Sequence, residues 1–272
     1  MQRRSFHALR ASKPSCRRRH GLRALTLAAL TLLLFLAGAA SAARIVYGDL
    51  VVFAEGGFKP TALPARHNAP ITLWTEGKIS TISGDQPPRL REVELEFDRH
   101  GSLVTSGLAS CTAPQLEGAT VAQARQACPK AIVGEGYGQA TVSSPQAPPY
   151  QITLPITLFN GPHQGGDATI LAYAYGTVPA PTAYVVPIVI EPIHDGPYGY
   201  RLKVAIPEID NGAAIPTAVH IRAGRFWTFR SHRYSYLNAR CEVGFLEAHG
   251  KFSFANGLTV SGSVSRPCTV RR

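Results

Sequence analysis

Apolar and polar residues alternate along much of the chain after residue 42, which is the pattern of β-strands with one face in a core. The clearest case is the segment Arg91–Asp98, in which Val93, Leu95 and Phe97 fall on one face. The opposite face carries four carboxylates, namely Glu92, Glu94, Glu96 and Asp98. We therefore predict a half-buried strand whose acidic face is solvated and lies opposite basic neighbours. A cation site or acid–base chemistry is the alternative role for these carboxylates.

Further short β-prone runs, bounded by Gly, Pro, Asn and Asp, lie on both sides of this segment. They are residues 51–53, 71–74, 78–82, 151–159, 169–175, 184–190 and 198–206. Two of these runs contain Pro155 or Pro187, which predicts edge positions or bulges because proline has no N–H for a ladder. The glycine-rich run 134–138 lacks the spacing of a nucleotide-binding loop and favours a bent or bulged strand.

The C-terminal segment predicts a β-hairpin with a three-residue loop, 255–257. Apolar or small residues occupy the even positions on both sides of this loop, and directly paired residues share a face. A three-residue loop pairs Phe254 with Leu258 and Phe252 with Val260, whereas a two-residue loop would pair even positions with odd ones. Gly257 then takes the left-handed position that such loops need.

The period of the pattern changes between Cys111 and Cys128. The run Thr120–Gln123 is a T-x-x-Q capping box, and an Ala-rich stretch follows until Pro129 stops it. The run Thr112–Gln115 repeats the same start signal. We predict one helical turn and then a two-turn helix, clamped by a disulfide because helices this short are marginal alone.

The first 42 residues have the three parts of a secretory signal peptide. A basic region ends at Arg23, an apolar run of 17 residues follows, and Ala40-Ser41-Ala42 is an A-x-A site. We predict cleavage after Ala42, with Ala43 as the near alternative. The apolar run also lies at the lower limit for spanning a bilayer, so an uncleaved membrane anchor is the alternative. The run Arg3–Phe6 resembles a twin-arginine signal, which leaves the export route open.

Four cysteines remain after the leader, and their spacing suits disulfides. Proximity in the sequence favours the pairs Cys111–Cys128 and Cys241–Cys268, although four cysteines allow three connectivities. A zinc site made from all four thiolates is the alternative. It lacks the C-x2-C knuckles that zinc usually takes, and an oxidising compartment opposes thiolates.

Composition and charge narrow the functional classes. Charged residues make up only 17% of the chain, which excludes a coiled coil. The 45% of hydrophobic residues argue against a wholly disordered chain, because they are enough for a core. Eight of the 28 basic residues and none of the 17 acidic residues lie in the leader, so the remainder has a net charge of +3. This small excess does not indicate a dedicated nucleic-acid-binding protein.

The common short catalytic motifs are missing from the sequence, including G-x-S-x-G, H-E-x-x-H, the P-loop and S-x-x-K. The seven histidines after the leader show no metal-ligand spacing, and we expect neither a metal nor another cofactor. His194 and Asp195 could form a base and its orienting carboxylate, but no nucleophile accompanies them. We favour a polar pair in a loop.

Arginine and aromatic residues concentrate between His220 and Arg240, an interval without any acidic residue. The candidate binding residues are Arg222, Arg225, Trp227, Arg230 and Arg233. Arginine beside exposed aromatic rings suits an anionic or carbohydrate polymer, through bidentate hydrogen bonds and stacking. The alternative is a purely structural segment with aromatic residues inward and arginines outward, some of them paired with Glu92–Asp98.

Several segments are similar to a group of uncharacterised exported proteins, chiefly from high-GC soil bacteria. They are F-N-G-P at 159–162, I-H-D-G-P-Y-G-Y at 193–200, Y-L-N-A-R-C at 236–241 and P-C at 267–268. The likeness covers most of the mature chain, including a cysteine pair around a short helix. The resemblance implies export and a β-rich unit that folds independently, and it assigns no catalytic residues.

Together these patterns predict an all-β fold, a β-sandwich built as one large or two packed β units with a small disulfide-clamped helical insert. The predicted parts are a signal peptide at 1–42, a β segment at 43–110, the insert at 111–130 and a second β segment at 131–272. We expect a secreted or cell-surface protein that binds an envelope or environmental polymer without catalysis. A secreted polysaccharide hydrolase, using the carboxylates of Glu92–Asp98, is the alternative.

Overall fold

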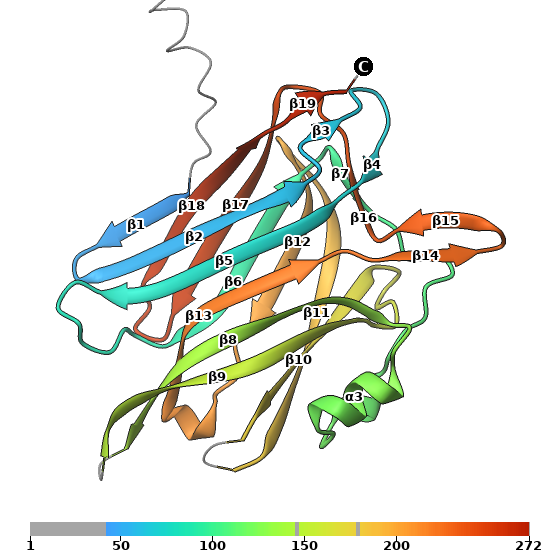
Figure 1. Cartoon of the computed structure of the whole chain (residues 1–272). Helices are drawn as coiled ribbons and strands as arrows, with labels where there is room; N and C mark the ends of the chain where they lie inside the picture. The colour runs from blue at the N-terminus through green and yellow to red at the C-terminus, as the bar shows by residue number, and fades with distance from the viewer. Residues whose placement is uncertain (1–41, 145–146, 178–179, 272) are drawn as a thin grey trace, which may run out of the picture. The chain divides into compact units, whose positions relative to one another are not determined.

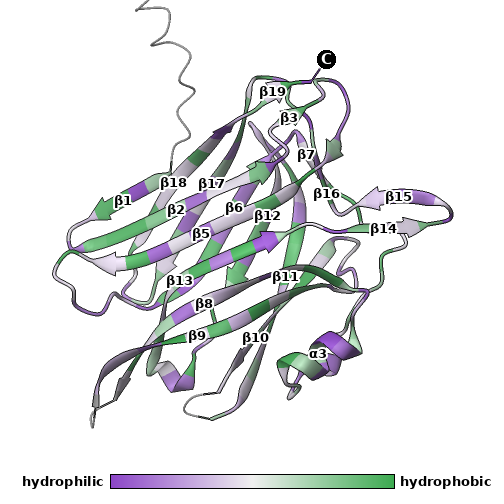
Figure 2. Ribbon diagram, viewed as in Figure 1, coloured by the Kyte–Doolittle hydropathy of each residue, from purple (hydrophilic) through white to green (hydrophobic). Residues whose placement is uncertain are grey.

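The computed structural model describes residues 42–144, 147–177 and 180–271, so the predicted leader lies outside the described residues except for Ala42. The described part is all-β with a small helical insert, as predicted (Figure 1). Apolar and polar residues alternate along the strands, which gives the sheet one face for the core (Figure 2).

Twelve antiparallel strands of the described residues form one large sheet. In chain order they are β1 (Ala43–Tyr47), β2 (Leu50–Lys59), β5 (Thr72–Thr81), β6 (Leu90–Asp98), β8 (Ile132–Ser144), β9 (Ala147–Asn160), β10 (Ala168–Gly176), β11 (Thr182–Asp195), β12 (Tyr198–Ala205), β13 (Ala214–Ala223), β17 (Phe245–Phe254) and β18 (Thr259–Pro267). Their order in the sheet is β1-β2-β5-β13-β8-β9-β10-β11-β12-β6-β17-β18. Strands from the two predicted β segments therefore share a single sheet, in which β6 of the first segment lies between β12 and β17 of the second.

The large sheet curls until its two ends pack face to face, as the layers of a sandwich do. One core cluster joins Val52 and Ile79 of β2 and β5 to Phe252 and Val260 of β17 and β18. The first and last strands lie beside each other, so the sheet nearly closes on itself. The C-terminal hairpin has the predicted register, with Phe252 opposite Val260 and a three-residue loop.

A side chain closes the seam where the two ends of the sheet meet. The pairing of β1 with β2 stops at Ala54, which leaves the backbone of Gly56 on an open edge. The guanidinium of Arg266, on β18, donates to the carbonyl oxygen of Gly56, contacts the carboxylate of Glu55 and lies 5.5 Å from the centroid of the Trp74 ring. No backbone pairing joins β18 to β1 or β2 among the described strands, and the largely buried Arg266 supplies polar contacts across the seam beside the apolar contacts of Ile45.

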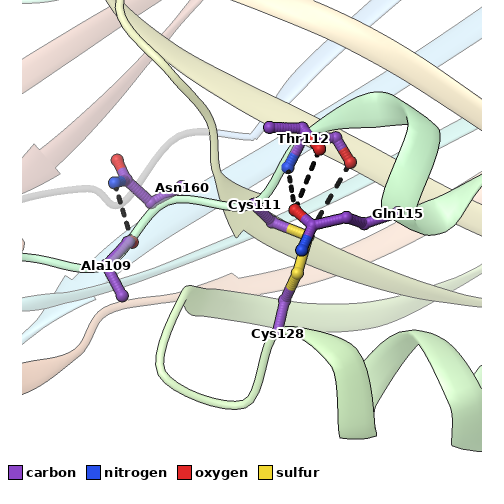
Figure 3. The surroundings of a disulfide bond; sticks show 6 residues. All are labelled: Ala109, Cys111, Thr112, Gln115, Cys128 and Asn160. Atoms are coloured by element: carbon purple, nitrogen blue, oxygen red, sulfur yellow. Dashed lines mark hydrogen bonds between the residues drawn. A yellow bond between two sulfur atoms is a disulfide. The ribbon is translucent and has the colours of Figure 1, made fainter.

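The helical insert has the predicted form (Figure 3). Helices α2 (Ala113–Leu116) and α3 (Val121–Ala127) each begin with the predicted capping box. The disulfide Cys111–Cys128 joins the two ends of the insert, with a Cα–Cα distance of 5.7 Å. Leu116 and Ala124 are buried against β9 and β10, and the side chain of Asn160 on β9 donates to the carbonyl oxygen of Ala109 at 3.0 Å.

Smaller sheets lie at one end of the large sheet. They are β4 (Ala69–Pro70) with β16 (Leu237–Ala239) and β7 (Gly101–Leu103), β14 (Phe226–Phe229) with β15 (His232–Ser235), and β3 (Ala62–Leu63) with β19 (Thr269–Val270). The second predicted disulfide, Cys241–Cys268, is also formed. All four cysteines of the described residues are therefore in disulfides, which removes the zinc alternative and is typical of an oxidising, extracellular environment.

Candidate functional site

The segment rich in arginine and aromatic residues folds into a hairpin, β14–β15, that extends away from the body of the sheet (Figure 1). Trp227 pairs with Tyr234, and Phe229 pairs with His232. Directly paired residues share a face, so these four side chains lie on one face of the hairpin. The opposite face carries Phe226, Thr228, Arg233 and Ser235.

The face that carries Trp227 attaches the hairpin to the rest of the molecule. The ring of Trp227 stacks on Tyr234 at 5.7 Å between centroids, and its Nε1 donates to the carbonyl oxygen of Ser106 at 3.2 Å. The ring of Phe229 lies against Gly107, where a Cβ atom would come within 2.2 Å of it. Trp227 is therefore an anchor of the hairpin rather than an exposed binding ring.

The opposite face and the tip of the hairpin present cations and an aromatic ring to solvent. The guanidinium of Arg233 lies 4.7 Å from the ring centroid of Phe226, which is 47% exposed. The guanidinium of Arg230 lies 5.1 Å from the ring of Phe229. Neither arginine forms an ion pair with any residue that the structure describes.

The two-residue loop at the tip of this hairpin is strained. Arg230 and Ser231 have φ angles of 49° and 64°, in the left-handed region that side chains disfavour. Hairpin loops of this kind usually contain Asn-Gly or Gly-Gly, which adopt such angles at little cost. Each residue with a β-carbon in this region costs on the order of 1 kcal/mol. Residues with strained backbone angles often cluster at functional sites, so the strain at this exposed cationic tip favours a functional role for it.

Two of the candidate arginines lie outside the hairpin. Arg222 is exposed on β13, opposite Trp74 and Glu135. Arg225 precedes the hairpin, and its Nη1 donates to the carbonyl oxygens of Ile132 at 2.7 Å and Pro129 at 3.2 Å. The structure therefore groups Trp227, Arg230 and Arg233, and gives Arg225 a structural partner.

We expect Arg225→Gln to lower the free energy of unfolding by about 2 kcal/mol, because hydrogen bonds from a charged donor contribute about 1.5–3 kcal/mol. Urea denaturation monitored by fluorescence measures this change. Arg222→Gln is the matched control, since its exposed guanidinium forms no ion pair among the described residues, and it should change stability by less than about 0.5 kcal/mol. Equal stability of the two variants would contradict a structural role for Arg225.

A groove of about 640 Å³ runs beside the hairpin. Phe226 forms one wall. The other lining residues come from the stretch between the end of β2 and the start of β5, which includes β3 and β4, namely Lys59, Pro60, Thr61, Ala62, Pro70, Ile71 and Thr72. A second hollow of about 330 Å³ shares Pro70 and Phe226 with the first and adds Arg233 and Tyr234. The hairpin and the groove therefore form one continuous surface, to which we refer as the hairpin–groove surface.

The far wall of the groove is held in place by the second disulfide. Strand β3 pairs with β19, which directly follows Cys268, and the N–H of Cys241 donates to the carbonyl oxygen of Pro64 at 2.9 Å. Below the wall, Leu63 and Ile71 belong to a core cluster that includes both cysteines. The groove is thus built on a rigid base.

The carboxylates of β6 have the predicted basic neighbours. The prediction that this acidic face is solvated is wrong for its second half, where Glu96 and Asp98 are each only 7% exposed. Arg201 and Lys203 of β12 contact Glu96 at 2.6 Å and Glu94 at 3.4 Å. Hydrogen bonding to Glu96 raises the pKa of the Arg201 guanidinium above its ordinary value. Asp98 is buried and accepts from the backbone N–H of His100 at 2.8 Å. The alternative pairing of β6 with the arginines of residues 220–240 is wrong, since β12 and β17 flank β6 in the sheet.

The other polar candidates form no catalytic group. His194 and Asp195 are exposed at the end of β11, where Asp195 lies 3.8 Å from Arg201. Among the described residues, no three His, Cys, Asp or Glu side chains are placed to hold a metal ion. No helix in the same part of the chain has both the length and the apolar character needed to cross a membrane.

The groove residues could not be found from the sequence, because Lys59 and Ile71 are far from the hairpin along the chain and belong to no motif. Of the residues that line the groove, only Phe226 lies in the segment between His220 and Arg240, which its arginine and aromatic content had singled out. Comparison with known proteins adds no assignment, since no family model, curated protein or solved structure matches the chain.

Proposed function

We propose that this protein is exported and binds an anionic polymer of the cell envelope or surroundings through the hairpin β14–β15, without catalysis. The observation that carries the proposal is the pair Arg230 and Arg233. Both guanidinium groups project from the protruding hairpin, lie over aromatic rings and have no acidic partner in the described part of the chain. An unpaired arginine held on a ring is already oriented for bidentate contact with carboxylate or phosphate groups.

Export is supported by the signal-peptide pattern of residues 1–42, by the two disulfides and by the resemblance to exported bacterial proteins. A protein that works outside the cell meets polyanions such as acidic surface polymers. A small cationic surface on a molecule of modest net charge then gives weak, salt-dependent attachment rather than indiscriminate adhesion.

A polysaccharide hydrolase is less consistent with the structure. Its two working carboxyl groups need to flank a bound sugar in a cleft. The carboxylates of Glu94 and Glu96 lie on a sheet face and are occupied by Arg201, Lys203 and His249. The two hollows described above are lined by other residues and contain no carboxylate.

The double variant Arg230→Gln/Arg233→Gln should bind a soluble polyanion, such as polyglutamate, about tenfold or more weakly at low salt. Each lost charge–charge contact removes roughly 1 kcal/mol near a surface, and two of them act together. Affinity of the unaltered protein should fall steeply as salt shortens the Debye length from about 10 Å at 0.1 M to about 3 Å at 1 M. Titration of labelled polyanion by fluorescence anisotropy measures both effects.

The matched control for this experiment is Arg222→Gln, which removes an exposed arginine from β13 and leaves the hairpin intact. It should keep most of the affinity and of the salt dependence. If the control loses as much affinity as the double variant, net charge rather than the hairpin governs binding. No binding of any polyanion at low salt would refute the proposed function.

A further inference from the structure

The hairpin–groove surface has a chemical character that the cationic tip alone does not explain. Its lining is mainly apolar, with Pro60, Ala62, Pro70 and Ile71 beside the exposed ring of Phe226. An exposed apolar hollow of this size beside polar rims is typical of a binding site rather than of inert surface.

Each of the two parts of this hollow, which share Pro70 and Phe226, is lined by one cation. Lys59 lines the larger part and Arg233 the smaller part, and both are exposed. No lining residue of either part is acidic. A ligand complementary to this arrangement carries negative charge on both sides of an apolar group.

The side chains that line the surface also indicate which class of polyanion fits it. Sugar rings need several side-chain acceptors and donors for their hydroxyl groups, and here only Thr61 and Thr72 supply hydroxyls besides Tyr234. The lining contains no amide side chain and no carboxylate. Most hydroxyl groups of a bound glycan would therefore find no hydrogen-bond partner on this surface. Each hydroxyl group that is buried without a partner weakens binding by its desolvation cost.

We propose that the hairpin–groove surface binds an extended acidic peptide segment of a partner protein, with one apolar side chain of the peptide seated against Phe226 and Pro70, the two residues that line both hollows. Acidic residues on either side of that apolar side chain then face Lys59 and Arg233. This inference rests on the proposed function, because it names the class of anionic ligand that the same surface takes. The rigid base of the groove, fixed by Cys241–Cys268, limits the entropy lost on binding.

The test uses the mature protein from residue 43 and two labelled peptides of equal length and equal negative charge. One peptide has a central leucine among Glu and Ser residues, and the other has serine in its place. The leucine peptide should bind about tenfold or more tightly, which is the lower end of what burial of a Leu side chain provides.

Phe226→Ala should remove most of the difference between the two peptides, and it should leave the weaker serine peptide nearly unaffected. This substitution is at a half-exposed position, so the fold should tolerate it. Tyr150→Ala is the matched control, because Tyr150 is also a partly exposed aromatic residue, 41% exposed, but lines neither hollow. It should preserve the preference for leucine.

The outcomes separate the two proposals. If neither peptide nor polyglutamate binds at low salt, both the proposed function and this inference fail. If both peptides bind equally well, or if Phe226→Ala keeps the full preference for leucine, only the inference fails. If an acidic polysaccharide of matched charge density binds more tightly than the leucine peptide, the inference also fails and the surface is assigned to glycans.

Discussion

Replacing Gly136 by alanine is expected to lower the free energy of unfolding by about 3 kcal/mol or more, among the largest effects of any single substitution in the sheet. Gly136 lies on β8, directly opposite Ile221 of β13. A Cβ atom at this position would lie 1.9 Å from the carbonyl oxygen of His220. That oxygen belongs to the backbone of the neighbouring strand, so it cannot move aside as a flexible side chain would. The two central strands must then separate and lose ladder hydrogen bonds.

Gly138→Ala is a closely matched control, because it adds the same methyl group to the same strand two residues further on. The nearest atom to a Cβ at Gly138 is the Cδ1 of Ile156 at 3.4 Å, an ordinary van der Waals contact with the end of a side chain. This variant should unfold within about 1 kcal/mol of the unaltered protein. Urea denaturation followed by circular dichroism compares the two. Similar denaturation midpoints for the two alanine variants would show that β13 does not need to stay this close to Gly136.

Local patterns in the sequence predicted local structure well. The parity of apolar residues around 255–257 favoured the observed three-residue loop over a two-residue loop, because a two-residue loop would pair even positions with odd ones. The two T-x-x-Q boxes marked both helix starts, since capping depends on residues three apart. Alternation also placed the carboxylates of β6 on one face, but it did not predict that Glu96 and Asp98 are buried by the neighbouring strands.

The prolines show where such reasoning stops. Pro155 and Pro187 were expected at edges or bulges, yet β9 and β11 are central strands. The pairing of β9 with β10 ends at Ile156, and that of β11 with β12 ends at Ile190. Each proline therefore lies in a stretch that pairs with one neighbouring strand only. Pro155 lies opposite Tyr137 of β8, and Pro187 lies opposite Leu171 of β10. The lack of an N–H correctly predicted that one ladder hydrogen bond is absent at each proline. The sequence of one strand does not show where its neighbours end, so it could not predict that this happens within central strands.

The candidate arginines show the same limit for function. The composition of residues 220–240 marked the correct segment, but it could not assign a role to each arginine. Arg225 is bound by carbonyl groups of residues 129 and 132, which approach it only because β8 pairs with β13. The apolar wall beside Phe226 comes from residues 59–62 and 70–72, which only the tertiary fold brings there. Sites assembled in this way leave no short motif.

Removal of the second disulfide by Cys241→Ser/Cys268→Ser should lower the free energy of unfolding by about 3.5 kcal/mol. This value follows from the loop entropy of two residues 27 apart in the sequence. The same variant should also bind the leucine peptide more weakly, because the wall at Lys59–Ala62 depends on the β3–β19 pairing that directly follows Cys268. Urea denaturation and peptide anisotropy, measured under conditions in which the variant remains folded, give the two results separately.

The first disulfide provides the control, because its loop is of similar size and neither of its cysteines lines either hollow. Its cysteines are 17 apart, so Cys111→Ser/Cys128→Ser should cost about 3 kcal/mol on the same loop-entropy estimate. The loss should fall on α2 and α3, whose buried residues Leu116 and Ala124 belong to a core cluster with residues of β8, β9, β10 and β11. Peptide binding should then remain near that of the unaltered protein. If both double variants lose affinity equally, the groove depends on overall stability and not on the anchor at Cys241–Cys268.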